Sequence, residues 1–483
     1  MAEDADRKIA EEAAESARGS IVAAAGCGKT EQIARATSLG NGRRLILTHT
    51  HAGVDVLRAR LAFHKVPRSR YRLETIAGFC LRYAAAFPVT SGLKTSSPAS
   101  DAEWRDVYKA ASQLIINQAA DEILKASYSG VFVDEYQDCS LAQHDVVNAL
   151  SRVLPVCVFG DPLQAIFDFK GQQPVDWDKD VFPVFPKKGE LLTPWRWHKK
   201  ENPKFAEWLA MVRVALDAGG HVDLAGRPPC VNWEALPTDQ NRRTMKIVEV
   251  CKRVRGEAGN GSVVVIADAS SIGIQAYIAK QLSKTGYSKI EPVGCESLYA
   301  SVKKLEKAKD FKQLQETVSF ITDCMTGAEE TPYLAAVNAR LEGRRAGAAK
   351  FGDLIDLGVA FLANPTFQNR LALLDAFHQR EECYCFRREM FHAMRAAHLL
   401  CISRPGLALA DAVRETQTRA RHAGRVVPRL SVGSTLLVKG LEFDHAVVVH
   451  TPKMTRRDWY VALTRATTGL TVLSPTQKFE PAA

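Results

Sequence analysis

Short apolar runs alternate with helical segments along the first part of the chain. Four segments have the length and composition of strands: Ile21 to Ala25, Arg44 to His51, Val131 to Val133 and Val153 to Phe159. Helical stretches such as Ala52 to Phe63 come between them. Because strands that alternate with helices usually pair in parallel, this pattern predicts an α/β fold with a parallel sheet.

The same alternation returns in the second half of the chain. We expect Ser262 to Ile266 to be the first strand of a second α/β core, with sheet segments at Ser434 to Leu437 and His445 to His450. A helix around Asp458 to Ala466 and a last strand, Gly469 to Leu473, complete the pattern. The sequence therefore predicts two parallel-sheet cores.

Each core is interrupted by a segment that reads as helix. Asp101 to Lys125 carries no strand signal, and the residues from about 296 to 425 are mostly helical and rich in Lys and Arg. We therefore predict four parts: a first core (1–83 and 126–215), its small helical insertion (84–125), a second core (216–295 and 426–483) and its helical insertion (296–425).

Composition narrows the class of protein. The net charge of +10 favours a polyanionic partner. The eleven cysteines are scattered and form no Cys-x-x-Cys pair, which argues against a zinc ribbon or a disulfide framework and fits reduced thiols in the cytoplasm. The N-terminus is acidic rather than signal-like, and no run of about 18 apolar residues occurs, so we expect no membrane partner.

The stretch from Ser20 to Thr30 has the pattern of a phosphate-binding loop. An apolar strand ends at Gly26, and Gly28-Lys29-Thr30 opens a helical run. Glycines let the backbone approach phosphates, and a helix N-terminus supplies positive potential. Lys29 would reach the β- and γ-phosphates of ATP and the Thr30 hydroxyl would bind Mg²⁺, although a chance Gly-Lys-Thr in a turn is the plain alternative.

A pair of carboxylates follows the buried strand Val131 to Val133. In a P-loop ATPase this is where one carboxylate holds Mg²⁺ and the next polarises the attacking water. We assign Asp134 to the metal and Glu135 to the base. Without the P-loop, an acidic turn after a strand would be an equally good interpretation.

Six motifs occur in a fixed order: GKT (28–30), DEYQD (134–138), GDPLQAIFDFKG (160–171), WR (195–196), KGLEFD (439–444) and VALTRA (461–466). In this series the chain resembles the superfamily 1A DNA helicases of the UvrD/Rep type, over both predicted cores. The resemblance implies two RecA-like P-loop domains with ATP bound between them. It also implies single-stranded or tailed duplex DNA across their tops, and movement in the 3′-to-5′ direction.

The resemblance also assigns roles to residues. Gln164 would sense the γ-phosphate, and Arg196 and Arg465 would be arginine fingers, each worth about 10³–10⁵ in rate. Nucleotide contacts would come from Ala25, Gly26, Cys27, Gly28, Lys29, Thr30, Gly440 and Glu442.

For DNA, the resemblance points to the segments that follow the strands of the first core: Thr48, His49, His51, Thr75, Phe167, Phe169 and Lys170. His49 and Phe169 are the expected stacking residues, because an aromatic face binds a base with about 1–3 kcal/mol without reading sequence. Phenylalanines at alternate positions are also common in cores, so that alternative stays open.

The chain departs from the family pattern at several positions. Asp4 to Arg18 lacks the glutamine that reads adenine in the family, so we expect weak discrimination between nucleobases. Ala23 and Ala24 replace glycines, Lys170 replaces an arginine and Leu436 replaces a frequent histidine. We therefore expect the coupling between DNA and ATP turnover to differ.

Three functions fit these observations to different degrees. The first is an ATP-dependent helicase or translocase. The second is a non-unwinding, DNA-activated ATPase that works with a separate nuclease in repair or phage defence, as in Gabija-type systems. The short insertions and the absence of a nuclease segment after the last motif favour such a partner. The third, a small-molecule kinase, does not explain the KGLEFD and VALTRA segments.

Overall fold

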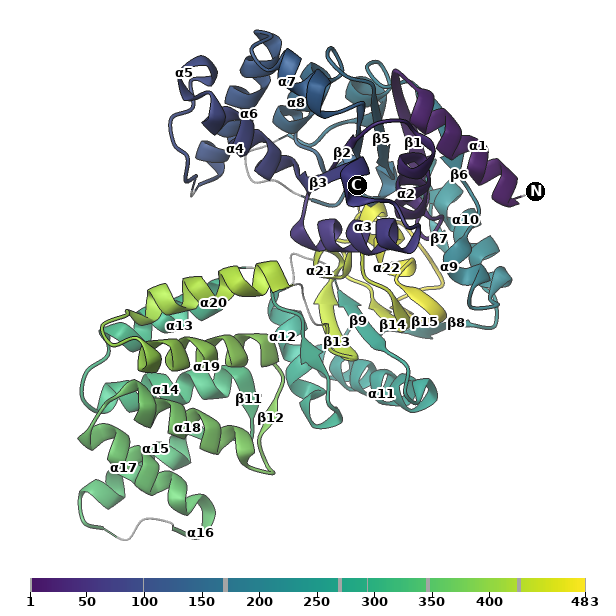
Figure 1. Cartoon of the computed structure of the whole chain (residues 1–483). Helices are drawn as coiled ribbons and strands as arrows, with labels where there is room; N and C mark the ends of the chain where they lie inside the picture. The colour runs from purple at the N-terminus through teal and green to yellow at the C-terminus, as the bar shows by residue number, and fades with distance from the viewer. Residues whose placement is uncertain are drawn as a thin grey trace. The chain divides into compact units, whose positions relative to one another are not determined.

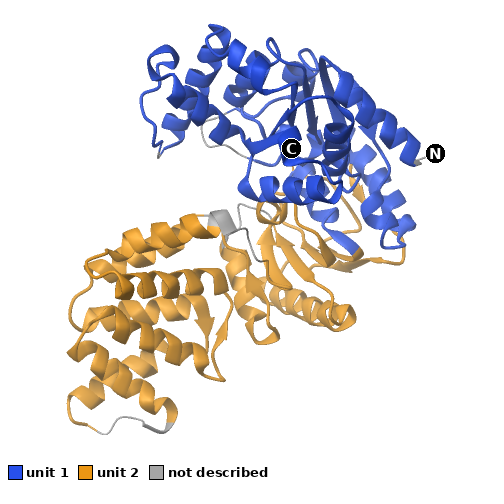
Figure 2. Ribbon diagram, viewed as in Figure 1, with its two compact units in different colours: residues 1–220, 455–467, 483 blue, residues 221–454, 468–482 orange. Residues whose placement is uncertain are grey.

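The computed structural model describes residues 2–98, 100–167, 173–267, 272–292, 294–344, 348–423 and 427–482. The chain forms two compact units (Figure 2). Unit 1 comprises Met1–Gly220 and Thr455–Thr467, and unit 2 comprises His221–Met454 and Thr468–Ala482. In the described part of the chain, no helix is both long and apolar enough to cross a membrane.

Unit 1 is built on a six-stranded sheet in the order β3-β2-β4-β5-β1-β6. Its neighbouring strands are all parallel. The strands are β1 (Arg18–Ala23), β2 (Arg44–Thr48), β3 (Tyr71–Thr75), β4 (Gly130–Val133), β5 (Val156–Gly160) and β6 (Lys187–Leu191). Parallel pairing brings the carboxyl ends of all six strands to one edge, which is where α/β sheets bind ligands.

Alternate side chains of these strands fill two cores, because successive residues of a strand face opposite sides of the sheet. Ile21 and Ile46 pack in one buried cluster, while Val22 and Leu47 pack in the other. Both clusters are closed by helices, so the four inner strands β1, β2, β4 and β5 are almost entirely buried, whereas the edge strands β3 and β6 have exposed positions. Burial on both faces explains why the sequence revealed the inner strands.

The helices of unit 1 cover the sheet and form the smaller insertion. They are α1 (Ala2–Glu15), α2 (Lys29–Leu39), α3 (His51–Phe63), α4 (Ile76–Ala86), α5 (Pro88–Ser91), α6 (Asp101–Ile116), α7 (Asp121–Ser127), α8 (Leu141–Leu150), α9 (Trp195–His198), α10 (Pro203–Asp217) and α22 (Arg456–Leu463). Helices α4, α6 and α8 pack side by side (Figure 1). Helix α22 packs on α10 and on the short η3 turn (Pro162–Gln164).

Unit 2 contains a second six-stranded sheet in the order β10-β13-β9-β14-β15-β8. The strands are β8 (Val231–Ala235), β9 (Val263–Ala267), β10 (Ser288–Lys289), β13 (Leu430–Ser434), β14 (Phe443–Val449) and β15 (Ala466–Ser474). The β10–β13, β13–β9, β9–β14 and β15–β8 pairs are parallel. The α/β class with two parallel sheets, predicted from the sequence, is therefore confirmed.

Helices and short strands make up the rest of unit 2. Near the sheet lie β7 (Val222–Asp223), α11 (Gln240–Ala258), α12 (Ile272–Gln281), α21 (Thr435–Val438) and β16 (Lys478–Phe479). The insertion consists of α13 (Glu296–Lys307), α14 (Phe311–Cys324), β11 (Met325–Thr326), α15 (Glu330–Leu341), α16 (Ala348–Phe351), α17 (Asp353–Ala363), α18 (Phe367–Gln379), β12 (Tyr384–Cys385), α19 (Arg388–Ser403) and α20 (Leu409–Ala423). Its helices form a bundle with a buried core of its own (Figure 1).

Two expectations about the second sheet are wrong. The first strand in sequence is β8, not the strand at 263–267, and β8 forms the sheet edge beside β15. Strand β13 ends at Ser434, where the expected strand began, because the Ser434 side chain accepts a hydrogen bond from Leu437 N and starts α21.

The four-part division of the chain stays a prediction. The segment Thr455–Thr467, which we counted with the second core, groups with unit 1 by its contacts. Its helix α22 begins with a capping box in which Thr455 and Asp458 bond each other's backbone.

Candidate nucleotide site and nucleic-acid surface

The loop between β1 and α2 is shaped by two glycines in the left-handed region. Gly26 has φ 73° and Gly28 has φ 85°. A Cβ atom on Gly26 would lie 2.7 Å from the Trp197 ring and 2.9 Å from the Cβ of Arg196. Both the backbone angle and the lack of room therefore require glycine at position 26.

The loop leads directly into the N-terminus of α2. The first hydrogen bond within this turn runs from Gln32 N to Gly28 O at 3.0 Å. The N–H groups of Lys29 and Thr30 precede it, so the helix geometry leaves them without a carbonyl partner of their own. A helix start of this kind presents donors and positive potential to an anion.

Lys29 is held between the two carboxylates that follow β4. Its Nζ lies 2.6 Å from Oε2 of Glu135 and 3.6 Å from Oδ1 of Asp134. Burial lowers the pKa of Lys29, but the charges of Glu135 and Asp134 outweigh burial and raise this pKa above its ordinary value. Burial raises the pKa of Asp134 to about 6, against the opposing charge of Lys29. The charges of Lys29, Asp134 and Glu135 therefore act directly on one another.

Glu135 itself has a strained backbone. Its φ of 54° and ψ of 40° are left-handed values that a side chain with Cβ seldom adopts. Its N–H donates to Oδ1 of Asp134 at 2.9 Å, and Nε2 of Gln137 donates to its Oε2. Strain of this kind, about 1–3 kcal/mol, persists where surrounding contacts hold the residue in place, and it is concentrated at functional sites.

These residues fit a magnesium-bound triphosphate. A glycine loop, a helix N-terminus and the Lys29 ammonium offer three features that bind phosphate. Asp134 is buried next to Lys29, and Thr30 is the second residue of α2. Among the described residues, no group of three or more His, Cys, Asp or Glu side chains could hold a metal ion.

Gln164 and Arg196 also lie at the carboxyl edge of this sheet. Gln164 is buried in the η3 turn, and its Nε2 donates to Oδ2 of Asp161 at 2.7 Å. Arg196 donates its backbone N–H to Gly26 O at 3.1 Å and its Nη1 to Thr464 O at 2.7 Å. Arg196 is therefore fixed directly against the phosphate loop.

Arg465 follows α22 and is 1% exposed. Its Nε donates to Val461 O at 2.9 Å and its Nη2 to the Thr464 hydroxyl at 2.8 Å. Two of its donors thus bond the end of its own helix. Gly440 and Glu442 lie in unit 2, on the segment between α21 and β14, and Gly440 has φ 76°.

The predicted DNA-binding residues differ from one another in exposure and in their contacts. Thr48 is 1% exposed at the end of β2, and the Thr75 hydroxyl caps α4 by accepting from Gly78 N at 3.0 Å. His49 is half-buried and lies 3.5 Å from Sγ of Cys139, while His51 is exposed at the start of α3.

Of the other three predicted DNA-binding residues, only Phe167 belongs to the part of the chain that the structure describes. Phe167 is half-buried after the η3 turn. Phe169 and Lys170 lie outside the described residues, so their predicted roles stay predictions.

Sequence reasoning missed four residues around this site. Trp195 borders the loop, since its Cδ1 would lie 3.5 Å from a Cβ on Gly28, and its Nε1 donates to Asp6 at 2.6 Å. Asp161, Arg213 and Tyr460 form a buried hydrogen-bonded group beside the loop. Trp195 and Asp161 lie within two of the six motifs and Tyr460 precedes a third. Arg213 lies on α10, between motifs, where no sequence pattern marks it.

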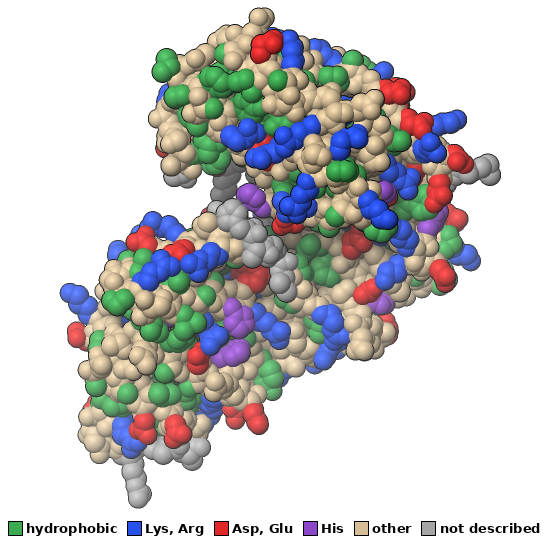
Figure 3. Space-filling model, in the orientation of Figure 1, with side chains coloured by type: hydrophobic (Ala, Val, Ile, Leu, Met, Phe, Trp, Pro, Cys, Tyr) green, Lys and Arg blue, Asp and Glu red, His purple; other side chains and the backbone are tan. Residues whose placement is uncertain are grey.

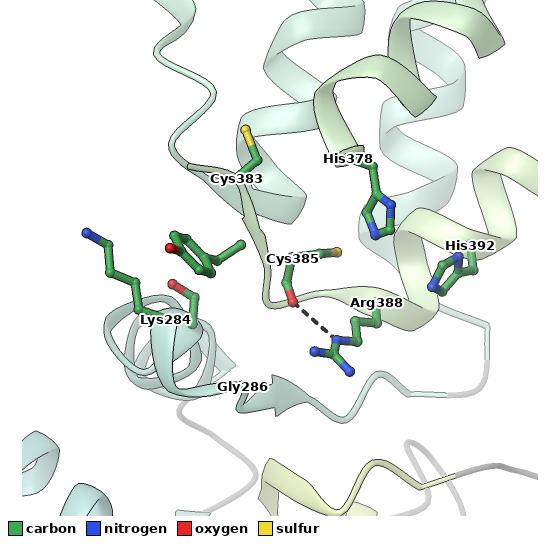
Figure 4. Close-up of a pocket in the computed structure, with 9 residues that line it drawn as sticks. Lys284, Gly286, His378, Cys383, Cys385, Arg388 and His392 are labelled. Carbon is green, nitrogen blue, oxygen red and sulfur yellow. Dashed lines mark hydrogen bonds between the residues drawn. The ribbon is translucent and has the colours of Figure 1, made fainter. Parts of the chain in front are cut away.

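A second hollow lies in unit 2, at the junction of α18, β12 and α19. It has a volume of about 370 Å³. Figure 4 shows His378, His392 and Arg388 beside Cys385, whose carbonyl accepts a 3.5 Å hydrogen bond from the Arg388 side chain. None of the predicted site residues lines it. Lys and Arg side chains are spread over both units on the face drawn in Figure 3.

The comparison with protein-family models agrees with the motif series. Residues 96–176 match the family described as UvrD/REP helicase N-terminal domain. This segment contains β4, both carboxylates and the β5–Gln164 region. No curated protein matches the chain.

Two solved helicases are similar at low identity. A complex of arterivirus nonstructural protein 10 (helicase) with DNA aligns with a TM-score of 0.36 and 10% identity, over 97% of this chain and 63% of the helicase. The PRRSV helicase aligns with a TM-score of 0.33 and 12% identity, over 98% of this chain and 57% of the helicase. This chain thus spans less than two thirds of the length of either helicase.

The matched segment lies in unit 1 and carries the acidic half of the phosphate site. The segment contains two of the six motifs, DEYQD (134–138) and GDPLQAIFDFKG (160–171), so the family match and the motif series agree over this part of the chain. The match of residues 96–176 to the UvrD/REP helicase N-terminal domain therefore confirms, over this segment, the resemblance predicted from the sequence.

Proposed function

We propose that this protein is an ATP-dependent DNA helicase or translocase that moves 3′-to-5′ on single-stranded DNA. The observation that carries the proposal is the contact of Lys29 with Glu135 and Asp134 beside a glycine loop and a helix start. A lysine, a metal-binding carboxylate and a base are the parts that phosphoryl transfer to water requires.

In this proposal Lys29 changes its partner during each cycle. Its ammonium pairs with Glu135 before the nucleotide binds, and with the β- and γ-phosphate oxygens afterwards. The exchange would free the Glu135 carboxylate to orient a water and accept its proton. Thr30 and Asp134 would hold Mg²⁺, which would supply neutralising charge on the phosphate oxygens.

Gln164, Arg196 and Arg465 of unit 1 would complete the site, and the nucleotide contacts of Gly440 and Glu442 stay predictions from the motif series. Donors fixed before the reaction are effective because they need no reorganisation as charge develops. Arg196 supports this role best, since its backbone is bonded to Gly26 of the loop.

DNA binding would use the carboxyl edge of the unit 1 sheet, where β2 and β3 end. His49 and His51 follow β2, and Phe167 follows the η3 turn. The net charge of +10 supports a polyanionic partner, single-stranded or tailed duplex DNA. The free cysteines found throughout the described chain support a location in the reducing cytoplasm.

Strand displacement on tailed duplexes tests this function. Duplexes with a 3′ tail, a 5′ tail or no tail would be incubated with Mg-ATP, and DNA-stimulated phosphate release would be measured on the same samples. We expect displacement only with the 3′ tail. Phosphate release without displacement on any substrate would favour the DNA-activated ATPase that works with a nuclease. No stimulation by DNA would contradict both functions.

A further inference from the structure

A chain of hydrogen bonds, partly buried, runs within unit 1 from the loop between β1 and α2 to Gln164, the proposed γ-phosphate sensor. Ala25 N donates to the Tyr460 hydroxyl at 3.0 Å, and Nη1 of Arg213 donates to the same oxygen at 2.8 Å. The same nitrogen lies 2.8 Å from Oδ1 of Asp161, whose Oδ2 accepts from Gln164 at 2.7 Å.

The chain continues to the proposed base. Asp161 N donates to Oε1 of Gln137 at 3.0 Å, and Nε2 of Gln137 donates to Glu135. Asp161 is therefore bonded on its backbone and on both carboxylate oxygens. The guanidinium of Arg213 bonds both Asp161 and Tyr460, and so links Asp161 to the loop.

Burial makes these bonds hard to replace by water. Asp161 is 0% exposed and Tyr460 is 2% exposed. Burial, followed by the charge of Asp161, raises the pKa of Tyr460, so the phenol stays protonated at neutral pH. A buried ion pair is weak evidence for stability, because its desolvation offsets its attraction. The Arg213–Asp161 pair lies between the loop and Gln164, so its position there needs a reason other than stability.

We propose that Tyr460 and Arg213 are positioning residues that fix the Ala25 amide of the phosphate loop and the Gln164 side chain relative to each other, through Asp161. This inference rests on the proposed ATPase function. If the Tyr460 oxygen is removed, the Ala25 and Arg213 donors lose a shared buried acceptor. The position of the loop then no longer depends on that of Gln164, although neither the loop nor Gln164 has been altered.

The test combines Tyr460→Phe, Gln164→Ala and the double variant, with DNA-stimulated kcat and KM for ATP as readouts. We expect Tyr460→Phe to lower kcat about tenfold, with KM within about threefold. The double variant should lose at least fivefold less than the product of the two single losses, because both changes break one connection. Arg213→Met should lower kcat further, and Arg213→Lys should recover part of the loss, since it keeps the charge beside Asp161.

Tyr333→Phe is the matched control. It also removes a buried tyrosine hydroxyl, which donates to Leu354 O at 2.8 Å in the helical insertion. It should change the melting temperature without changing kcat. A Tyr460→Phe variant with wild-type kcat, or losses that multiply with Gln164→Ala, would overturn the inference while leaving the ATPase proposal intact. A wild-type protein without ATPase activity would instead overturn the proposed function itself.

Discussion

The Nζ atom of Lys29 lies 2.6 Å from Oε2 of Glu135, and it joins the first residue of α2 to the end of β4. These two residues are far apart in sequence and are brought together because β1 and β4 are parallel strands of one sheet, separated only by β5. The carboxyl ends of the strands thus bring the Lys29 ammonium and the Glu135 carboxylate into contact.

Replacement of the lysine should abolish turnover. Lys29→Ala removes the fixed positive charge that would face the β- and γ-phosphates, and loss of one such contact lowers kcat by about 10²–10³. Lys94→Ala is the control, since that lysine pairs with Asp106 at 2.8 Å on an exposed surface. Phosphate release with saturating single-stranded DNA measures both variants. Similar activity in Lys29→Ala and Lys94→Ala would refute the loop assignment.

Arg465 should affect rate far more than nucleotide affinity. Arg465→Met keeps much of the buried volume but removes the guanidinium, so an arginine-finger role predicts a loss of about 10³–10⁵ in kcat. ADP binding should stay within about tenfold of wild type, because the finger acts in the transition state. Arg395→Met, which breaks a pair with Asp375 in the helical insertion, is the control. A wild-type rate in Arg465→Met would argue against an arginine-finger role for Arg465.

Binding of single-stranded DNA should weaken with salt and depend little on sequence. The logarithm of affinity should fall with a slope of about −0.7 per phosphate neutralised. His49→Ala should cost about 1–3 kcal/mol of binding if the ring stacks on a base. Fluorescence anisotropy with oligo-dT and mixed-sequence strands at several salt concentrations measures these effects. A flat salt response would argue against a phosphate-binding surface.

The helical insertion should lose stability in mild acid because of His398. Burial lowers the pKa of His398 to about 4 in the folded state, against 6.5 for the free side chain. Since the folded pKa is the lower one, the unfolded state binds the proton first as the pH falls. Stability is therefore complete above about pH 6.5 and declines toward pH 4.

At pH 5.5 this difference amounts to about 1.4 kcal/mol relative to pH 7.5. Comparison of melting temperatures at the two pH values, in wild type and in His398→Leu, isolates the histidine. The variant should be less sensitive to pH over this interval. Equal sensitivity in the two proteins would mean that other groups dominate the acid response.

Strands that are apolar on both faces are the elements that the sequence predicts best. The strands around Ile21, Leu45 and Val131 were recognised because helices cover both sides of their sheet, so hydrophobic runs are continuous. Strand β8 was missed because it lies at a sheet edge and has no continuous hydrophobic run: it reads Val-Asn-Trp-Glu-Ala, a short alternation of apolar and polar residues.

Functional residues were predictable only where a motif marks them. Lys29 and Glu135 fall in motifs with a chemical rationale, and the structure brings them together. Arg213 became visible only through its hydrogen bonds to Asp161 and Tyr460, which lie 52 and 247 residues away in sequence. Contacts over such separations depend on the tertiary fold, and local composition carries no trace of them.

The most direct test of the central claim is the Glu135→Gln variant, measured for both nucleotide binding and hydrolysis. Glutamine keeps the size of the side chain but cannot accept the proton of the attacking water. The account predicts that Mg-ATP binds within about threefold of wild type, while DNA-stimulated hydrolysis falls by about 10²–10⁴, the usual contribution of a general base. Hydrolysis at the wild-type rate with binding intact would contradict the assignment of Glu135, and with it the proposed site of ATP cleavage.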